Sequence, residues 1–108
     1  MDLKPLAKDA VGRALERAER YRLLNEPEGA ESICLDVLRL EPRNQAALVM
    51  LLLALTDQFP AGGTVDRARA VLPTLHDEYE RVYYAGLICE RRAKALLHRG
   101  GPGSSFAA

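Results

Sequence analysis

The residues of this chain that could do chemistry are few, and their spacing suits no common site. His76 and His98 lie far apart, and neither shares its own helix with a carboxylate or cysteine at metal-ligand spacing. Asp77 and Glu80 lie at the start of a predicted helix, where acidic side chains cap a helix N-terminus more readily than they form a catalytic pair. We therefore expect no enzyme, no bound metal and no cofactor.

The two cysteines and the glycine-rich end also favour structural roles. Cys34 and Cys89 lie on apolar faces of predicted helices, without CxxC spacing or a nearby histidine. This indicates buried, reduced thiols in a cytosolic protein. Residues 100–103 follow a helix instead of preceding one, so their amide groups would not converge on a phosphate. We expect residues 100–108 to form a flexible, Gly/Ser-rich C-terminal end.

Charge and hydropathy exclude two further classes of function. Fifteen Lys and Arg residues balance 15 Asp and Glu residues, so bulk electrostatic binding of nucleic acid or an anionic membrane is not expected. The longest apolar run, residues 46–55, is about half of the ~20 residues that a membrane span requires. No apolar signal segment follows Met1. The predicted location is the cytoplasm.

The apolar run is the element around which the chain is organised. Residues 46–55 are Ala, Leu and Met with a single Val, a composition that favours a helix over a strand. A helix that is apolar on nearly every side must be covered on nearly every side. We therefore expect it in the middle of a helical stack.

The rest of the chain also reads as helices separated by breakers. Apolar residues recur at helical spacing, and Pro27, Asn44 and Asp77 are suited to open or cap helices. Pro73 lies within a helical stripe and predicts a kink or an early end there. The expected fold class is all-α, with five helices and no strand. The helices are expected to begin near Pro5, Pro27, Gln45, Val65 and Glu78.

The first, third and fifth predicted helices are related by a period of 34 residues. This period relates Ala14 to Leu48, and Leu48 to Val82. With a helix–turn–helix in each period, the chain resembles the tetratricopeptide repeat (TPR) family. Tyr21 stands at the family's late aromatic position in the first helix, and Ala30 at the small residue where two helices cross. Ala14 departs from the family, which has a bulky aromatic residue there.

The resemblance implies an architecture and a role. Residues 1–99 would form about two and a half divergent repeats, stacked as a short right-handed superhelical solenoid. Such repeats act as scaffolds or adaptors that bind a peptide or a partner protein in a concave groove. The groove positions carried over from the family are Leu15, Glu19, Arg22, Val49, Leu53, Thr56, Tyr83, Leu87 and Glu90.

Two alternatives stay open. The chain could be a small helical bundle with an accidental period, serving as an oligomerisation or regulatory domain. Nucleic-acid binding through the basic end of the last helix is less favoured, because residues 90–94 read as a solvated face.

The last helix is apolar on two faces, so one face needs a partner. Val82, Gly86 and Cys89 are expected to cover the stack, and Gly86 indicates a close approach of another helix. Either the chain is a fragment of a longer repeat protein, or this helix pairs with another subunit. The side chains expected to meet the other subunit are Tyr84, Leu87 and Ile88.

Overall fold

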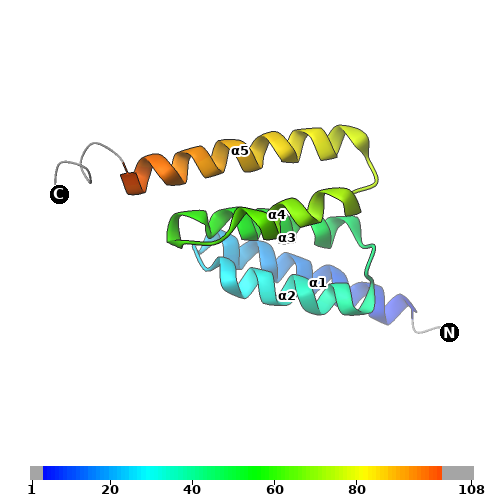
Figure 1. Ribbon diagram of the computed structural model, residues 1–108. Helices are drawn as coiled ribbons and strands as arrows, with labels where there is room; N and C mark the ends of the chain where they lie inside the picture. The colour runs from blue at the N-terminus through cyan, green and yellow to red at the C-terminus, as the bar shows by residue number, and fades with distance from the viewer. Residues whose placement is uncertain (1–3, 101–108) are drawn as a thin grey trace. The chain divides into compact units, whose positions relative to one another are not determined.

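The computed structural model describes residues 4–100, and over that range the chain is all-helical, without a strand (Figure 1). This confirms the predicted fold class. Of the C-terminal segment 100–108, expected to be flexible, residues 101–108 lie outside the described residues, and Gly100 is the last residue of a helix instead. Among the described helices, none combines the length and apolar composition that crossing a membrane requires. The elements are α1 (Lys4–Leu23), α2 (Pro27–Leu40), α3 (Gln45–Asp57), η1 (Phe59–Ala61), α4 (Val65–Val71), η2 (Leu72–Thr74) and α5 (Glu78–Gly100).

The chain divides into two compact units, Met1–Ala54 and Leu55–Ala108, and the boundary falls within α3. The first unit contains α1, α2 and most of α3. The second contains the last turn of α3, the 3-10 turns η1 and η2, and helices α4 and α5.

In the first unit α1 and α2 form an antiparallel hairpin with a tight turn (Figure 1). Asn25 adopts a left-handed conformation with φ of 62°, which asparagine tolerates better than most residues. The Glu26 amide donates to the Tyr21 carbonyl at 2.8 Å, and Pro27 then occupies the first turn of α2. The predicted break and restart at Pro27 are confirmed.

Small residues let the two helices of the hairpin approach closely. Ala18 and Ala30 are fully buried, and Gly29 lies against the ring of Tyr21. A Cβ atom added at Gly29 would lie 3.2 Å from Cδ1 of Tyr21, which is tighter than ordinary van der Waals contact. The close approach therefore depends on a residue without a side chain at this position.

The core of the first unit continues from the hairpin into α3. Val11 of α1, Val37 of α2 and Ala47 of α3 form a buried cluster, flanked by the half-buried Leu15 and Leu38. The Asn44 side chain caps α3, because its Oδ1 accepts a hydrogen bond from the Ala47 amide at 2.9 Å. The predicted cap is confirmed.

Helix α3 is covered along almost all of its length. Every residue from 47 to 56 is buried or half-buried, and Leu52 is 0% exposed. The prediction that this apolar helix is enclosed on nearly every side is confirmed.

In the second unit a glycine ends the turn after α3. Phe59 opens η1 with a buried side chain, and Gly62 follows with φ of 99°, a conformation that favours glycine. The Gly63 amide donates to the Gln58 carbonyl at 2.8 Å. The segment between α3 and α4 therefore contains an ordered 3-10 turn.

Pro73 ends α4 early, as predicted. Helix α4 stops at Val71, and the Leu72 amide bonds the Arg69 carbonyl, which Pro73 cannot reach because it has no N–H group. The chain continues as η2 to the buried Leu75. Asp77 then caps α5 by accepting a hydrogen bond from the Tyr79 amide at 3.0 Å.

Helix α5 runs antiparallel to α4 and contacts η1, α4 and η2 (Figure 1). Its buried face carries Ile88, which is 0% exposed, with Tyr84 and Leu87 half-buried. Val82, Gly86 and Cys89 are exposed instead. The expectation that these three cover the stack, while Ile88 meets a partner, is wrong. Both faces are apolar, and the face with the larger side chains removes more apolar area from water when buried.

The prediction that another helix approaches Gly86 closely is also not met within the described residues. A Cβ atom at Gly86 would meet no other heavy atom within 4 Å among the described residues. Among the described residues, therefore, no helix makes the close approach that Gly86 was expected to permit.

Candidate functional site

The residues predicted to line a groove have unequal access to solvent. Glu19, Tyr83 and Glu90 are exposed. Thr56 and Ile88 are 1% and 0% exposed, so neither offers its side chain to a partner in this structure, because both belong to the interior. The half-buried members of the set are Leu15, Arg22, Val49, Leu53, Tyr84 and Leu87.

Three of these residues have a defined environment within their own unit. Leu15 packs against the buried cluster of Val11 and Val37, so much of its side chain already serves the core. The rings of Tyr83 and Tyr84 contact each other edge to face, with centroids 4.9 Å apart. Tyr83 also stacks on Tyr79 at 6.4 Å, which places an aromatic group near the start of α5.

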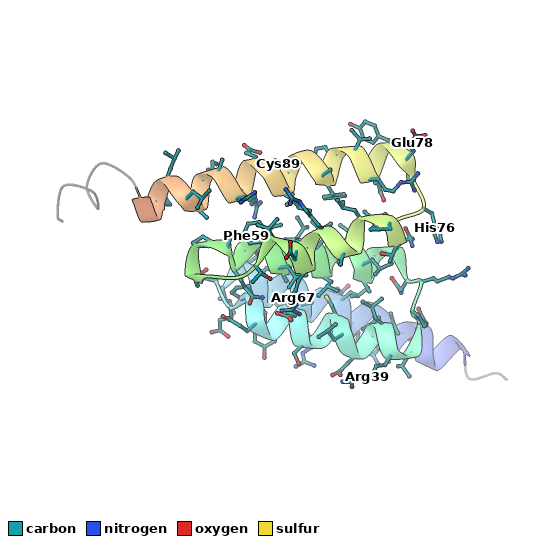
Figure 2. The ribbon with its side chains drawn as sticks, viewed as in Figure 1. Arg39, Phe59, Arg67, His76, Glu78 and Cys89 are labelled. Atoms are coloured by element: carbon teal, nitrogen blue, oxygen red, sulfur yellow. The ribbon has the colours of Figure 1, made fainter. Side chains whose placement is uncertain are left out.

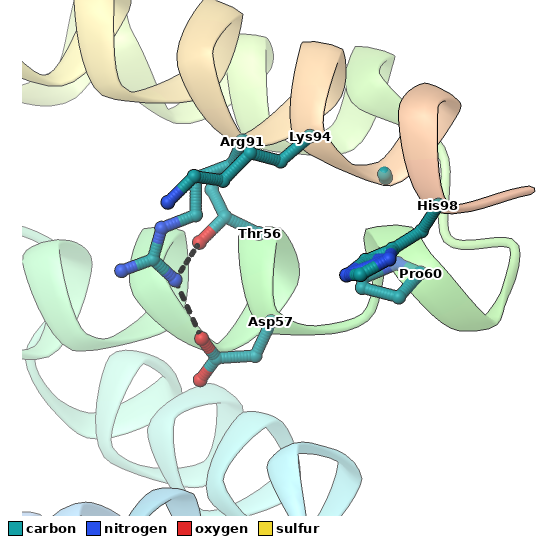
Figure 3. A pocket seen from close by; sticks show the side chains of 7 residues that line it. Thr56, Asp57, Pro60, Arg91, Lys94 and His98 are labelled. Atoms are coloured by element: carbon teal, nitrogen blue, oxygen red, sulfur yellow. Dashed lines mark hydrogen bonds and ion pairs between the residues drawn. The ribbon is translucent and has the colours of Figure 1, made fainter. Parts of the chain in front are cut away.

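A hollow of about 330 Å³ lies in the second unit, between the last turn of α3, η1 and α5 (Figure 3). In its lining the guanidinium of Arg91 donates to Oδ1 of Asp57 at 2.8 Å and to Oγ1 of Thr56 at 3.3 Å. These bonds fix the orientation of Arg91 and tie α5 to the end of α3. The lining residues are Thr56, Asp57, Pro60, Arg91, Lys94, Ala95 and His98.

The lining of this hollow carries more basic side chains than acidic ones. Lys94 and His98 follow Arg91 at helical spacing and are exposed, and Asp57 is the one carboxylate in the lining. Among the described residues, no group of three or more His, Cys, Asp or Glu side chains could hold a metal ion. The sequence did not indicate the Arg91–Asp57 pair, because its partners are far apart along the chain.

A second hollow, of about 260 Å³, lies between α1 and α2 in the first unit. Val11, Ile33 and Leu40 give it an apolar lining, and Arg17 and Asp36 add opposite charges. It is a shallow groove on the hairpin that could accept an apolar side chain.

On the side of α5 away from Ile88, exposed uncharged residues recur along the helix, and we call this set the outer stripe. Its members are all exposed, and Tyr79 and Val82 reach 74% and 67% exposure. Figure 2 labels one of them, Cys89, on α5. The outer stripe comprises Tyr79, Val82, Gly86, Cys89, Ala93 and Leu96.

The two cysteines differ in their environment. Burial raises the pKa of the Cys34 thiol to about 11, Arg22 acts to lower this pKa, and Glu31 raises it. Because the thiolate is the nucleophile, Cys34 is chemically inert. Cys89 is exposed, so the expectation that both thiols are buried is wrong for Cys89.

Partial burial also raises the pKa of the Tyr84 hydroxyl, with further contributions from Glu80 and Tyr83. The Tyr84 side chain therefore stays neutral at physiological pH. Its role is to pack along the edge of the buried face of α5.

Comparison with known proteins assigns no family to this arrangement of helices. A scan against protein-family models finds no match, and searches of curated proteins and of solved structures find no significant match either.

Proposed function

We propose that this chain is a protein–protein interaction module, a scaffold or adaptor built from divergent TPR-like hairpins that binds a peptide or a partner protein. The observation that carries the proposal is the packing of α1 on α2. The hairpin approaches through Ala18, Ala30 and Gly29, with Tyr21 against Gly29. Tyr21 and Ala30 stand at the positions where the repeat places its aromatic and small residues.

The exposed aromatic group on α5 supports the same proposal. Tyr79 and Tyr83 are exposed and stacked on each other. Tyrosine is enriched at protein interfaces, because it contributes a large rigid contact area and a hydroxyl group that bonds at the wet edge. Tyr83 is also one of the groove positions that the repeat implies.

In this proposal the repeats stack as a short right-handed superhelix, and its concave face binds the partner in the cytoplasm. The side chains that would make first contact are those already exposed, Glu19, Tyr83 and Glu90. The module has no catalytic role.

Affinity capture followed by mass spectrometry tests this proposal. The immobilised wild-type chain is compared with Tyr83→Ser and with Leu24→Ser, a matched change at an exposed apolar residue outside α5. We expect a protein that the wild type and Leu24→Ser retain and that Tyr83→Ser loses. Capture of no protein above a blank matrix, or equal capture by all three chains, would contradict the proposal.

A second candidate function, an oligomerisation domain, is favoured by one specific observation. The outer stripe of α5 is apolar over several turns and exposed. A contiguous apolar surface of this kind marks an interaction site on most proteins.

A further inference from the structure

We propose that the outer stripe of α5 is the interface of an antiparallel homodimer, in which α5 of one chain packs against α5 of a second copy. This inference rests on the proposed role in protein–protein contact and names the partner. It concerns the face opposite Ile88, which this chain leaves exposed.

The spacing of the outer stripe is that of a helix pair. Its six members alternate steps of three and four residues, from Tyr79 through Gly86 to Leu96. This is the spacing of the first and fourth positions of a heptad, which form the contact line between two packed helices. The 23 residues of α5 provide three such heptads.

One antiparallel register pairs every member of the stripe with a member of the second copy. Gly86 then lies opposite Cys89 of the partner subunit, and Val82 lies opposite Ala93 of the partner subunit. Tyr79 lies opposite Leu96 of the partner subunit. The small residues meet at the centre and the large ones at the two ends.

The small residues at the centre of this helix pair explain why α5 has a glycine, Gly86, in its middle. Glycine in a helix interior is unfavourable by about 1 kcal/mol relative to alanine. No neighbour within the described part of the chain approaches Gly86 closely. A second α5 at a short interaxial distance would occupy that space, since the separation of packed helices depends on the side chains at the contact.

The charges along α5 favour the antiparallel orientation. Its first turn is acidic, with Glu78 and Glu80, whereas its later turns carry Arg92 and Lys94. Antiparallel pairing places the acidic turn of each copy beside the basic turns of the other and opposes the two helix dipoles. Parallel pairing would bring like charges together at both ends.

Sedimentation velocity tests the dimer. We expect the wild-type chain to sediment as a dimer at micromolar concentration and Val82→Glu to sediment as a monomer. Leu24→Glu, the same kind of change at an exposed leucine off the stripe, should stay dimeric. Circular dichroism should show equal helix content in all three, because both sites are exposed. A monomeric wild type, or a Val82→Glu variant that remains dimeric, overturns the proposal.

Cysteine pairing tests the orientation. In a Cys89→Ser background, one chain carries Tyr79→Cys and a second carries Leu96→Cys. Oxidation of the mixture should give a disulfide-linked heterodimer, whereas each chain alone should give little linked product. Linkage of each chain to itself would indicate parallel pairing and overturn the register, as would no linkage in the mixture.

Failure of this inference is distinct from failure of the proposed function. A monomeric wild type would exclude the homodimer and would leave the result of the Tyr83-dependent capture experiment unaffected. Loss of capture by a chain that is still dimeric would exclude the proposed external partner and would leave the homodimer in place.

Discussion

The two thiols offer a direct contrast at the residue scale. Cys89 is exposed on α5, whereas Cys34 is buried in α2 with a pKa raised to about 11. With a thiol-specific disulfide reagent at pH 8, and at a dilution where the chain is monomeric, we expect Cys89 to react fast and Cys34 to react only as the chain unfolds. Cys89→Ser should abolish the fast phase. Fast reaction of both thiols in the folded wild type would contradict the burial of Cys34.

The raised pKa of the Cys34 thiol predicts how the stability of the fold depends on pH. The Cys34 thiol titrates near 9.0 in the unfolded chain and near 11 in the fold, so the folded state holds this proton more tightly. Its stabilising contribution is complete below pH 9 and is lost as the pH rises towards 11. Urea denaturation in Cys34→Ala should show a smaller loss of stability over that interval than the wild type. An equal loss in both proteins would show that Cys34 does not cause it.

Gly86 and Gly29, both in helices, predict different responses to alanine. Gly86→Ala meets no neighbour among the described residues and should raise the free energy of unfolding by roughly 0.5–1 kcal/mol, measured at high dilution. Gly29→Ala gains the same helix propensity but pushes Cβ against the Tyr21 ring at 3.2 Å. We expect its gain to be smaller or reversed. Equal gains at both positions would show that the hairpin has room at Gly29.

The helix boundaries were predictable from the sequence, because the interactions that cause them are local. Each of the residues at these boundaries starts, caps or ends a helix through interactions within a few residues of sequence. They are Pro27, Asn44, Pro73 and Asp77. The Arg91–Asp57 pair was not predictable, because a contact between distant segments exists only once the fold brings them together.

At the scale of the element, the cap of α3 can be tested by a single substitution. Asn44 accepts a hydrogen bond from the Ala47 amide and donates one to Oε1 of Glu41 at 2.8 Å. Asn44→Ala should lower the free energy of unfolding by about 1 kcal/mol. Asn44→Asp keeps the accepting oxygen and should lose less. Thermal melts of the three proteins give the comparison, and no difference between them would exclude a capping role.

The buried face of α5 could not be predicted from the sequence of this helix alone. The sequence predicted the helix and its two apolar faces, but its prediction of which face is buried was wrong. Periodicity fixes which residues share a face, whereas contacts with η1, α4 and η2 decide which face is covered. Ile88 and Ala95 lie inward, and Val82 and Cys89 lie outward.

At the scale of the whole molecule, stability depends on the enclosed helix α3. Leu52 is fully buried, and Leu52→Ala should lower the free energy of unfolding by about 2–5 kcal/mol through lost transfer energy and the cavity left behind. Leu52→Asp should leave little folded protein, because it buries an unpaired charge. A neutral Leu52→Ala in denaturant titrations would mean that α3 is not central to the core.

The central claim is that α5 buries one apolar face and offers the other to a second protein surface. Methyl NMR of the wild-type chain and of the Val82→Glu variant tests it most directly, because Leu96 and Ile88 report on the two faces separately. We expect the methyl signals of Leu96 to differ between the wild-type dimer and the monomeric variant, while that of the buried Ile88 stays fixed. Leu96 signals that are the same in the two proteins would contradict the claim.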